Sequence, residues 1–139
     1  MVIYIAASWK HAHAVRMLTD LLRADGHVVM SFPETEGQPQ SGVAGNLEEW
    51  IWSEDGERCF VFDTDCAASA NLVIYIGPSG TDAWAEVGIA WGKGIPIWGL
   101  WAKGEQAGLM RRLVTEWFTD HRKLVEQLRD YPTGERRDV

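Results

Sequence analysis

Three short runs of almost uninterrupted apolar residues limit the possible fold of this chain more than any other feature. They cover Val2–Ala6, Leu72–Gly77 and Ile95–Trp101. Strands of a parallel sheet are covered on both faces and show such runs, whereas a strand with one wet face alternates apolar and polar residues. We therefore expect three buried parallel strands here, with His27–Phe32 as a fourth, weaker candidate.

Helical patterns separate these runs. Val15, Leu18, Leu21 and Leu22 share one face of a helix over residues 12–24, which Asp25-Gly26 would end. Thr81 or Asp82 would cap a second helix that runs to about Lys93-Gly94. Two closing helices are expected over Glu105–Phe118 and Asp120–Tyr131.

Alternating strands and helices predict an α/β fold of the doubly wound, flavodoxin- or Rossmann-like kind. Its parallel sheet would have four or five strands, although the sequence does not place the fifth. At 139 residues the chain fits a single domain over 1–139.

Composition narrows the classes of function. A formal charge of -7 disfavours polymeric nucleic acid as a partner. The apolar runs are far shorter than the roughly 20 residues that cross a bilayer, and no signal peptide is evident. Two cysteines, Cys59 and Cys66, are too few for a disulfide scaffold and are expected to share a buried helix face. We expect a soluble, cytoplasmic protein without a membrane partner.

The middle of the chain is acidic and has two readings. Residues 33–62 form either a solvated loop with a short amphipathic helix or a lid over a binding site. Residues 132–139 are expected to fray. The eight tryptophans likewise either fill the core or line a pocket for a flat ligand.

Ligands of an open parallel sheet bind beyond the carboxyl ends of its strands, where the strand order reverses. If the first and third strands are neighbours, residues 6–11 and 77–82 meet there. The sequence AASWKH in the first loop offers the Ser8 hydroxyl, the Lys10 cation and the N–H groups of the next helix. This is either an anion site or an ordinary strand-to-helix turn.

The second loop leads into a helix whose first turn or so is expected to carry a single carboxylate, Glu86, among Ala, Gly, Val, Ile and Trp residues. The helix N-terminus would favour its ionised form, and a charged carboxylate in a dry pocket suits a nucleophile. Alternatively, Glu86 faces water. Asp63 and Asp65, expected just before the helical stretch that leads to Leu72–Gly77, are candidates for a second carboxylate that donates a proton.

Metal chemistry is not expected. His11 and His13 are two residues apart and would point in different directions on a helix. We therefore expect no metal and no cofactor.

Three motifs resemble those of the nucleoside 2-deoxyribosyltransferase-like superfamily. They are IY-x-A-A-x-W at 3–9, an Asp followed after six residues by Ala-Asn at 63–71, and AWAEVGIAWGKGIPI at 83–97. This superfamily contains deoxyribosyltransferases and deoxynucleoside monophosphate N-glycosidases. The resemblance implies a doubly wound sheet, usually of five strands, and a homodimer or a higher homo-oligomer.

The same resemblance implies roles for individual residues. Glu86 would be the nucleophile that forms a covalent glycosyl intermediate, Asp63 the acid that handles the proton of the base, and Tyr4 the group that positions Glu86. Trp9 would lie beside the base or the sugar.

Two features depart from the pattern of the superfamily. Gly80 stands where many deoxyribosyltransferases have a substrate-contacting Asp, and Asp82 lies nearby but out of register. The first loop is also poorer in Gly and Ser than the phosphate loop of the monophosphate hydrolases. Lys10 and His11 nevertheless make a phosphorylated substrate plausible.

The sequence thus predicts an enzyme that cleaves or transfers the N-glycosidic bond of a nucleoside or nucleotide. The expected substrate-binding residues are Ser8, Trp9, Lys10, His11, Gly80 and Asp82. Two alternatives stay open: a glutamate-dependent NAD glycohydrolase similar to TIR domains, and a non-catalytic nucleotide-binding module.

Overall fold

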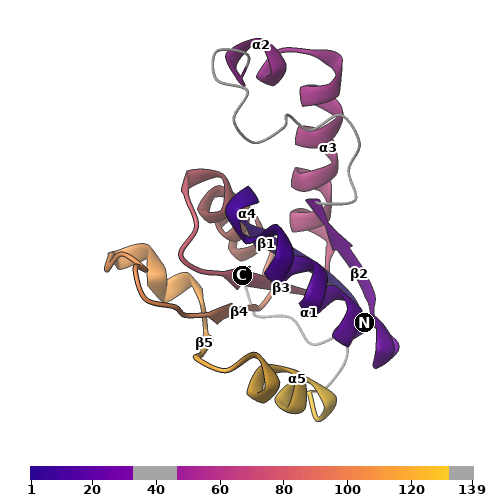
Figure 1. Ribbon diagram of the computed structural model, residues 1–139, viewed down its shortest axis with the longest axis vertical. Coiled ribbons are helices and arrows are strands. Elements are labelled where there is room, and N and C mark those ends of the chain that lie inside the picture. The colour runs from indigo at the N-terminus through magenta and orange to yellow at the C-terminus, as the bar shows by residue number, and fades with distance from the viewer. Residues whose placement is uncertain (33–46, 132–139) are drawn as a thin grey trace.

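A computed structural model of the chain describes residues 1–32 and 47–131 (Figure 1). Its helices and strands, in chain order, are β1 Val2–Ala7, α1 Ala12–Ala24, β2 Val28–Ser31, α2 Leu47–Ile51, α3 Glu54–Ser69, β3 Leu72–Ile76, α4 Thr81–Gly92, β4 Ile97–Leu100, β5 Glu116–Phe118 and α5 His121–Arg129. Short 3-10 helices span Trp9–His11 and Leu109–Leu113.

The strands form one five-stranded, wholly parallel sheet in the order β2-β1-β3-β4-β5. This confirms the predicted doubly wound α/β class. Strand β1 pairs with β2 on one side and with β3 on the other. The strand order therefore reverses between β1 and β3. These two strands are neighbours, as the predicted site at residues 6–11 and 77–82 requires.

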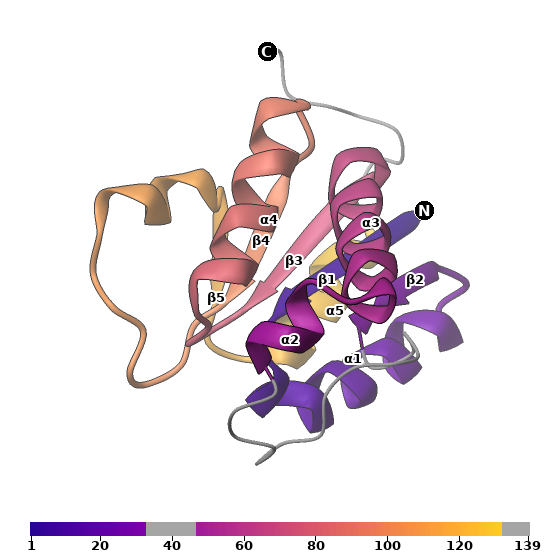
Figure 2. The ribbon, with the colours of Figure 1, turned by 90° about the horizontal axis from the view of Figure 1, so that it is seen from above.

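Both faces of the sheet are covered because successive side chains of a strand point to opposite sides. Ile3 and Ile5 of β1 belong to the core beneath α1 and α5. Tyr4 and Ala6 belong to the core beneath α3 and α4. Figure 2 shows α3 and α4 side by side across one face of the sheet. Double coverage explains why the strands lack polar alternation.

The helix predicted over residues 12–24 is confirmed with those bounds. It ends as expected, because Asp25 is its C-cap and Gly26 follows with a φ of +91°, a conformation that favours glycine. The closing helix predicted over Asp120–Tyr131 is also present, as α5.

The helix predicted over Glu105–Phe118 is wrong. That stretch holds a 3-10 helix and then β5, the fifth strand that the sequence did not place. A strand of three residues is too short to show any periodicity. Pairing with β4 defines it, with Gly99 opposite Trp117 and Leu100 opposite Phe118.

Two smaller predictions are also wrong. Helix α4 begins at Thr81, and its N-cap is Gly80 without a side-chain cap, rather than Thr81 or Asp82. Asp63 and Asp65 lie within α3 instead of before a helix, because α3 begins at Glu54, where the Ser53 hydroxyl accepts a hydrogen bond from the Gly56 N–H.

Of the acidic segment 33–62, residues 33–46 lie outside the described residues, as does the predicted tail 132–139. The described remainder forms α2 and the first part of α3, which project from the body of the molecule (Figure 1).

Cys59 and Cys66 are both buried on α3. None of the described helices combines the length and the apolar character that crossing a bilayer demands.

Gly99 of β4 packs against the ring of Trp117, so replacing it by Ala tests the packing of this edge. A Cβ at Gly99 would lie 2.7 Å from Cζ3 of Trp117 and 2.9 Å from a methyl carbon of Val114. We expect Gly99→Ala to lower the free energy of unfolding by about 1–3 kcal/mol, measured by urea denaturation. Gly92→Ala is the control, because its Cβ would meet no atom within 4 Å in the described structure. Equal stability of both variants would contradict this account.

Candidate active site

A partly buried hydrogen bond joins the centre of the sheet to the middle of α4. The Tyr4 hydroxyl donates to Oε1 of Glu86 at 2.9 Å. Tyr4 is fully buried because it lies in the central strand β1 beneath α3 and α4. Glu86 lies one helical turn after the buried Ala83 and just before the buried Val87, so its side chain leans toward the sheet rather than toward solvent.

A second carboxyl group, that of Asp63 on α3, lies within electrostatic range of this pair. One of its oxygens, Oδ1, is buried and has no hydrogen-bond partner among the described residues. A buried carboxylate oxygen without a partner is costly, and it leaves an acceptor open to a ligand or a proton. The structure therefore brings together Tyr4, Asp63 and Glu86, which are distant in sequence.

Burial changes the acidity of all three groups. It raises the pKa of Glu86 to about 8, with a further increase from the charge of Asp63 and a partial decrease from the Tyr4 hydrogen bond. Burial also raises the pKa of Asp63 to about 6, against the opposing effect of the Tyr4 hydroxyl. The pKa of Tyr4 is raised by burial and by the two carboxylates, so its hydroxyl stays protonated and remains a donor.

The expectation that the start of α4 keeps Glu86 charged is wrong. Glu86 is the sixth residue of α4, beyond the first turn, where the helix dipole acts most strongly. Desolvation and the neighbouring Asp63 outweigh that effect. Near neutral pH the pair of carboxyl groups therefore shares about one proton.

The loops after β1 and β3 are bonded to each other at the carboxyl edge of the sheet. The Ser8 N–H donates to the Ser79 hydroxyl at 2.9 Å, and the Gly80 N–H donates to the Ser8 hydroxyl at 2.8 Å. Nε2 of His11 lies 2.5 Å from the Pro78 carbonyl oxygen and donates to it. The Ser8 hydroxyl and Nε2 of His11 thus hold the loop after β1 and the loop after β3 together.

The remaining predicted residues lie around this edge. Trp9 is 43% exposed and packs on Phe32, with ring centroids 4.5 Å apart. Lys10 and Gly80 line a cavity of about 480 Å³ beside the start of α4. Asp82 is exposed, and its charge raises the pKa of both Asp63 and Glu86.

A second polar network at the end of β3 was not predicted. The Tyr75 hydroxyl donates to Oε2 of Glu105 at 2.7 Å and accepts from the Ser79 N–H at 2.9 Å. The ring of Tyr75 packs on Trp84 at a centroid distance of 4.5 Å. Tyr75 lies in an apolar run and Glu105 in a segment that was expected to be helical, so no local signal linked them.

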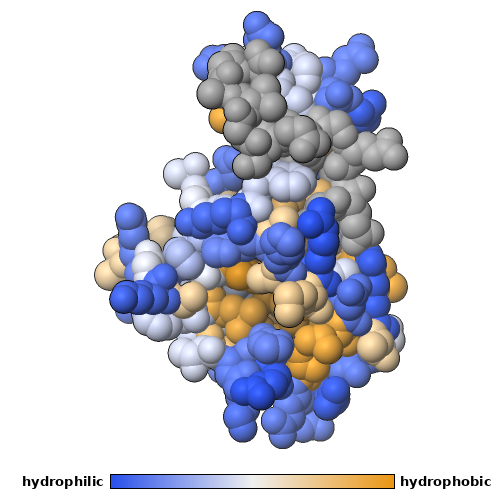
Figure 3. Space-filling view, viewed as in Figure 1, coloured by the Kyte–Doolittle hydropathy of each residue, from blue (hydrophilic) through white to orange (hydrophobic). Residues whose placement is uncertain are grey.

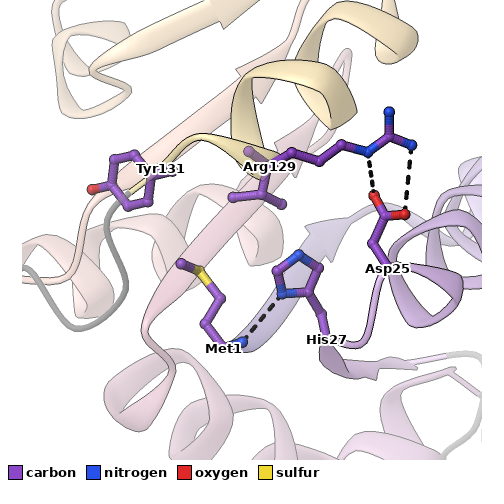
Figure 4. Close-up of a pocket in the computed structure, with 6 residues that line it drawn as sticks. Met1, Asp25, His27, Arg129 and Tyr131 are labelled. Carbon is purple, nitrogen blue, oxygen red and sulfur yellow. Dashed lines mark hydrogen bonds and ion pairs between the residues drawn. The ribbon is translucent and has the colours of Figure 1, made fainter.

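A separate cavity of about 250 Å³ lies at the opposite edge of the sheet, before the starts of β1 and β2 (Figure 4). The Met1 amino group is 3.1 Å from Nδ1 of His27, and Arg129 pairs with Asp25 at 2.9 Å. Burial and the Met1 ammonium lower the pKa of His27.

Within the described part of the chain, no cluster of three or more His, Cys, Asp or Glu side chains is arranged to hold a metal ion.

The structure is that of a doubly wound α/β protein with a pair of partly buried carboxyl groups near the switch point of its sheet. No protein-family model matches the chain, and no curated protein matches its sequence. Among solved structures, the fold is similar to that of a CMP N-glycosidase, BcmB, from Clostridium botulinum, with 20% identity and a TM-score of 0.61 over 94% of this chain and 100% of that one.

The chain is also similar to a 2-deoxyribosyltransferase from the psychrotolerant bacterium Bacillus psychrosaccharolyticus. The identity is 21% and the TM-score 0.67, over 90% of each chain. Likenesses at this level of identity establish the shared fold. The activity of this chain has to be argued from its own site.

The raised pKa of Glu86 makes stability depend on pH. Between the ordinary value of 4.5 and about 8, the folded state holds a proton that the unfolded state has lost, so stability falls as pH rises. We expect Glu86→Gln, which stays neutral and still accepts the Tyr4 hydrogen bond, to match the wild type near the lower end of this range. Above the upper end it should be more stable by on the order of 2 kcal/mol.

Thermal and urea unfolding across this range would measure the difference, with Asp20→Asn on the exposed face of α1 as the control. A Glu86→Gln effect that does not change with pH would contradict the assigned protonation state.

Proposed function

We propose that this chain belongs to the nucleoside 2-deoxyribosyltransferase-like superfamily and cleaves or transfers the N-glycosidic bond of a nucleoside or nucleotide. The supporting observation is the partly buried hydrogen bond from Tyr4 to Glu86, with the carboxyl group of Asp63, whose Oδ1 is buried, beside it. Enzymes that cleave glycosidic bonds commonly use two carboxyl groups in unlike environments, one as a nucleophile or base and the other as an acid. The similar folds named above belong to proteins that act on such substrates.

In the proposed reaction, a carboxylate oxygen of Glu86 bonds to the anomeric carbon of the sugar. The bond from that carbon to the base nitrogen breaks, and its electron pair leaves with the base. Asp63 supplies the proton that neutralises the departing base. The ionised Asp63 then takes a proton from water or from a second base, which attacks the same carbon. Glu86 leaves as a carboxylate, and the enzyme is a hydrolase or a transferase respectively.

Tyr4 is proposed as the positioning residue of this reaction. Its hydroxyl fixes one oxygen of Glu86 and leaves the other for the sugar. As a donor it favours the ionised form and partly offsets the desolvation that raises the pKa of Glu86. The positive charge that develops on the sugar in the transition state favours the same ionised form.

The carboxyl edge of the sheet supplies the proposed substrate contacts. Trp9 offers an aromatic surface for the base or the sugar, while Lys10, Ser8 and the start of α4 at Gly80 can bind a hydroxyl or phosphate group. In this proposal His11 organises the loop, and the charge of Asp82 tunes the two carboxyl groups. The proposed protein is a single-domain, cytoplasmic homodimer or higher homo-oligomer without a cofactor, whose substrate is a small molecule.

Variants of the two carboxyl groups test these roles. We expect Glu86→Ala to lower kcat/KM by at least about 10³-fold, because no nucleophile remains. Asp63→Asn should lower it by about 10²–10⁴-fold on neutral bases and much less on an N7-methylated purine, whose base leaves without protonation. Release of the base would be followed by chromatography for nucleosides, their 5′-monophosphates and NAD.

Glu126→Gln, on the exposed side of α5, is the matched control and should keep full activity. Full turnover by Glu86→Ala on a cleavable substrate would overturn the nucleophile. Cleavage of NAD alone would replace the proposed substrate. Ligand binding without product, unchanged in Glu86→Ala, would identify a binding module instead.

The pH profile tests the shared proton. Below about 6 both carboxyl groups are protonated, so the nucleophile is absent; above about 8 both are ionised, so the acid is absent. We therefore expect kcat/KM to follow a bell whose limbs belong to the pair rather than to either residue. Asp63→Asn with the N7-methylated purine should keep only the limb that reports ionisation of Glu86. A wild-type profile without limbs in this range would contradict the shared proton.

A further inference from the structure

Glu105 lies in the segment between β4 and β5, where the neighbouring side chains face water. Among residues 101–110, all of which the structure describes, Glu105 alone is not exposed. A hydrogen bond from the Glu105 N–H to the Ala102 carbonyl, at 3.1 Å, closes a turn at this point. The surface of this segment, at the left edge of Figure 3, mixes hydrophilic and apolar residues. The inward position of one acidic side chain in such a segment needs a physical reason.

The contacts of the Glu105 carboxylate supply that reason. The Tyr75 hydroxyl, near the end of β3, donates to Oε2 of Glu105 at 2.7 Å. The same oxygen occupies the space where a side chain at Gly77 would begin, since a Cβ at that position would overlap it. Tyr75 is fully buried, and its ring packs on Trp84 of α4. Glu105 therefore approaches β3 at a position that only a glycine leaves open.

The donors and acceptors of the network follow a fixed order that begins at Glu105. A carboxylate can only accept, and a phenol has one proton, which Tyr75 gives to Glu105. Toward Ser79 the Tyr75 oxygen can therefore only accept, and it receives the Ser79 N–H at 2.9 Å. The Ser79 hydroxyl donates to the Ile76 carbonyl, so the same hydroxyl accepts the Ser8 N–H at 2.9 Å. One acceptor between β4 and β5 thus orders the bonds that reach the loop after β1.

Ser8, the last member of this network, is left with a proton to donate. Its hydroxyl oxygen accepts the Gly80 N–H at 2.8 Å. Within residues 1–32 and 47–131, no acceptor receives the proton of the Ser8 hydroxyl. Gly80, Ser79 and Glu105 border the cavity of about 480 Å³ beside α4. A sugar or phosphate oxygen of a ligand at this edge is a suitable acceptor for the free proton.

We propose that Glu105 is the positioning residue of the substrate-binding edge. Acting through Tyr75 and Ser79, it holds the loop after β3 against the loop after β1 and presents the Ser8 hydroxyl to the substrate as a donor. This inference rests on the proposed function and adds to it a residue outside the three sequence motifs. Glu86 is held separately, by Tyr4, so Glu105 serves the binding of the substrate rather than the bond-breaking step.

Kinetics of Glu105→Ala and Glu105→Gln test this role on the nucleoside or nucleotide that the wild type cleaves best. We expect Glu105→Ala to raise KM about tenfold and to change kcat less than about threefold, because the substrate contacts loosen and the carboxyl pair does not. Glu105→Gln keeps an oxygen that accepts the Tyr75 hydroxyl, so its KM should stay within about twofold of the wild type. Partial unfolding would instead lower kcat and leave KM unchanged. Tyr75→Phe, which keeps the ring packing on Trp84, should behave like Glu105→Ala.

Amide hydrogen exchange tests the same network without turnover. Measured by NMR, Glu105→Ala and Tyr75→Phe should each lower the protection of the Ser8 and Ser79 amides at least about tenfold, because the bonds that protect them lose their anchor. Amides in the middle of β1 and β3 should exchange as in the wild type. Glu126→Ala removes an exposed carboxylate from α5 and is the matched control, with unchanged exchange and unchanged KM.

The outcomes separate this inference from the proposed function. If the wild type is active and Glu105→Ala keeps either its KM or the protection of Ser79, the inference is overturned and the proposed function stands. A Glu105→Gln variant as impaired as Glu105→Ala would also overturn it, because charge rather than hydrogen bonding would then matter. If the wild type cleaves no nucleoside or nucleotide, the proposed function fails, and full protection of Ser79 in Glu105→Ala would show that Glu105 does not hold the loops either.

Discussion

The candidate site depends on one partly buried hydrogen bond, from the Tyr4 phenol to the Glu86 carboxyl group. In such surroundings the bond is stronger than in water, and an unpaired partner would be costly. Forming it requires a central strand covered on this face, a helix across it and a carboxyl group that points inward. The strand order, the packing of α4 and the position of α3 together supply these conditions.

The sequence predicted the elements that depend on local pattern. The runs that became β1, β3 and β4 needed only their continuous apolar character, and α1 needed only its spacing and the Asp25-Gly26 stop. The prediction failed where long-range pairing decides the structure. Strand β5 exists because Glu116–Phe118 pairs with β4, and nothing in three residues announces it.

In the candidate site, too, local sequence predicted some features and long-range contacts decided others. The Glu86 motif and the first loop could be recognised from the sequence, whereas only the fold brings Tyr4 and Asp63 to Glu86. The protonation of Glu86 could not be predicted, because it is set by burial and by Asp63 on another helix, whereas the sequence shows only the nearby helix start. The Tyr75–Glu105 bond was missed because one partner is hidden in a strand and the other lies in a misassigned segment.

The resting protonation has a consequence for any reaction at this site. Burial raises the pKa of both carboxyl groups, so at intermediate pH the pair holds one proton that the two groups share. The proposed reaction requires that this proton lies on Asp63 while Glu86 is ionised. Positive charge developing on a bound sugar stabilises an ionised Glu86, and a base nitrogen at Asp63 gives the proton a destination. In the proposed reaction, the free-energy cost of burying the two carboxyl groups is offset only when charge develops in the transition state.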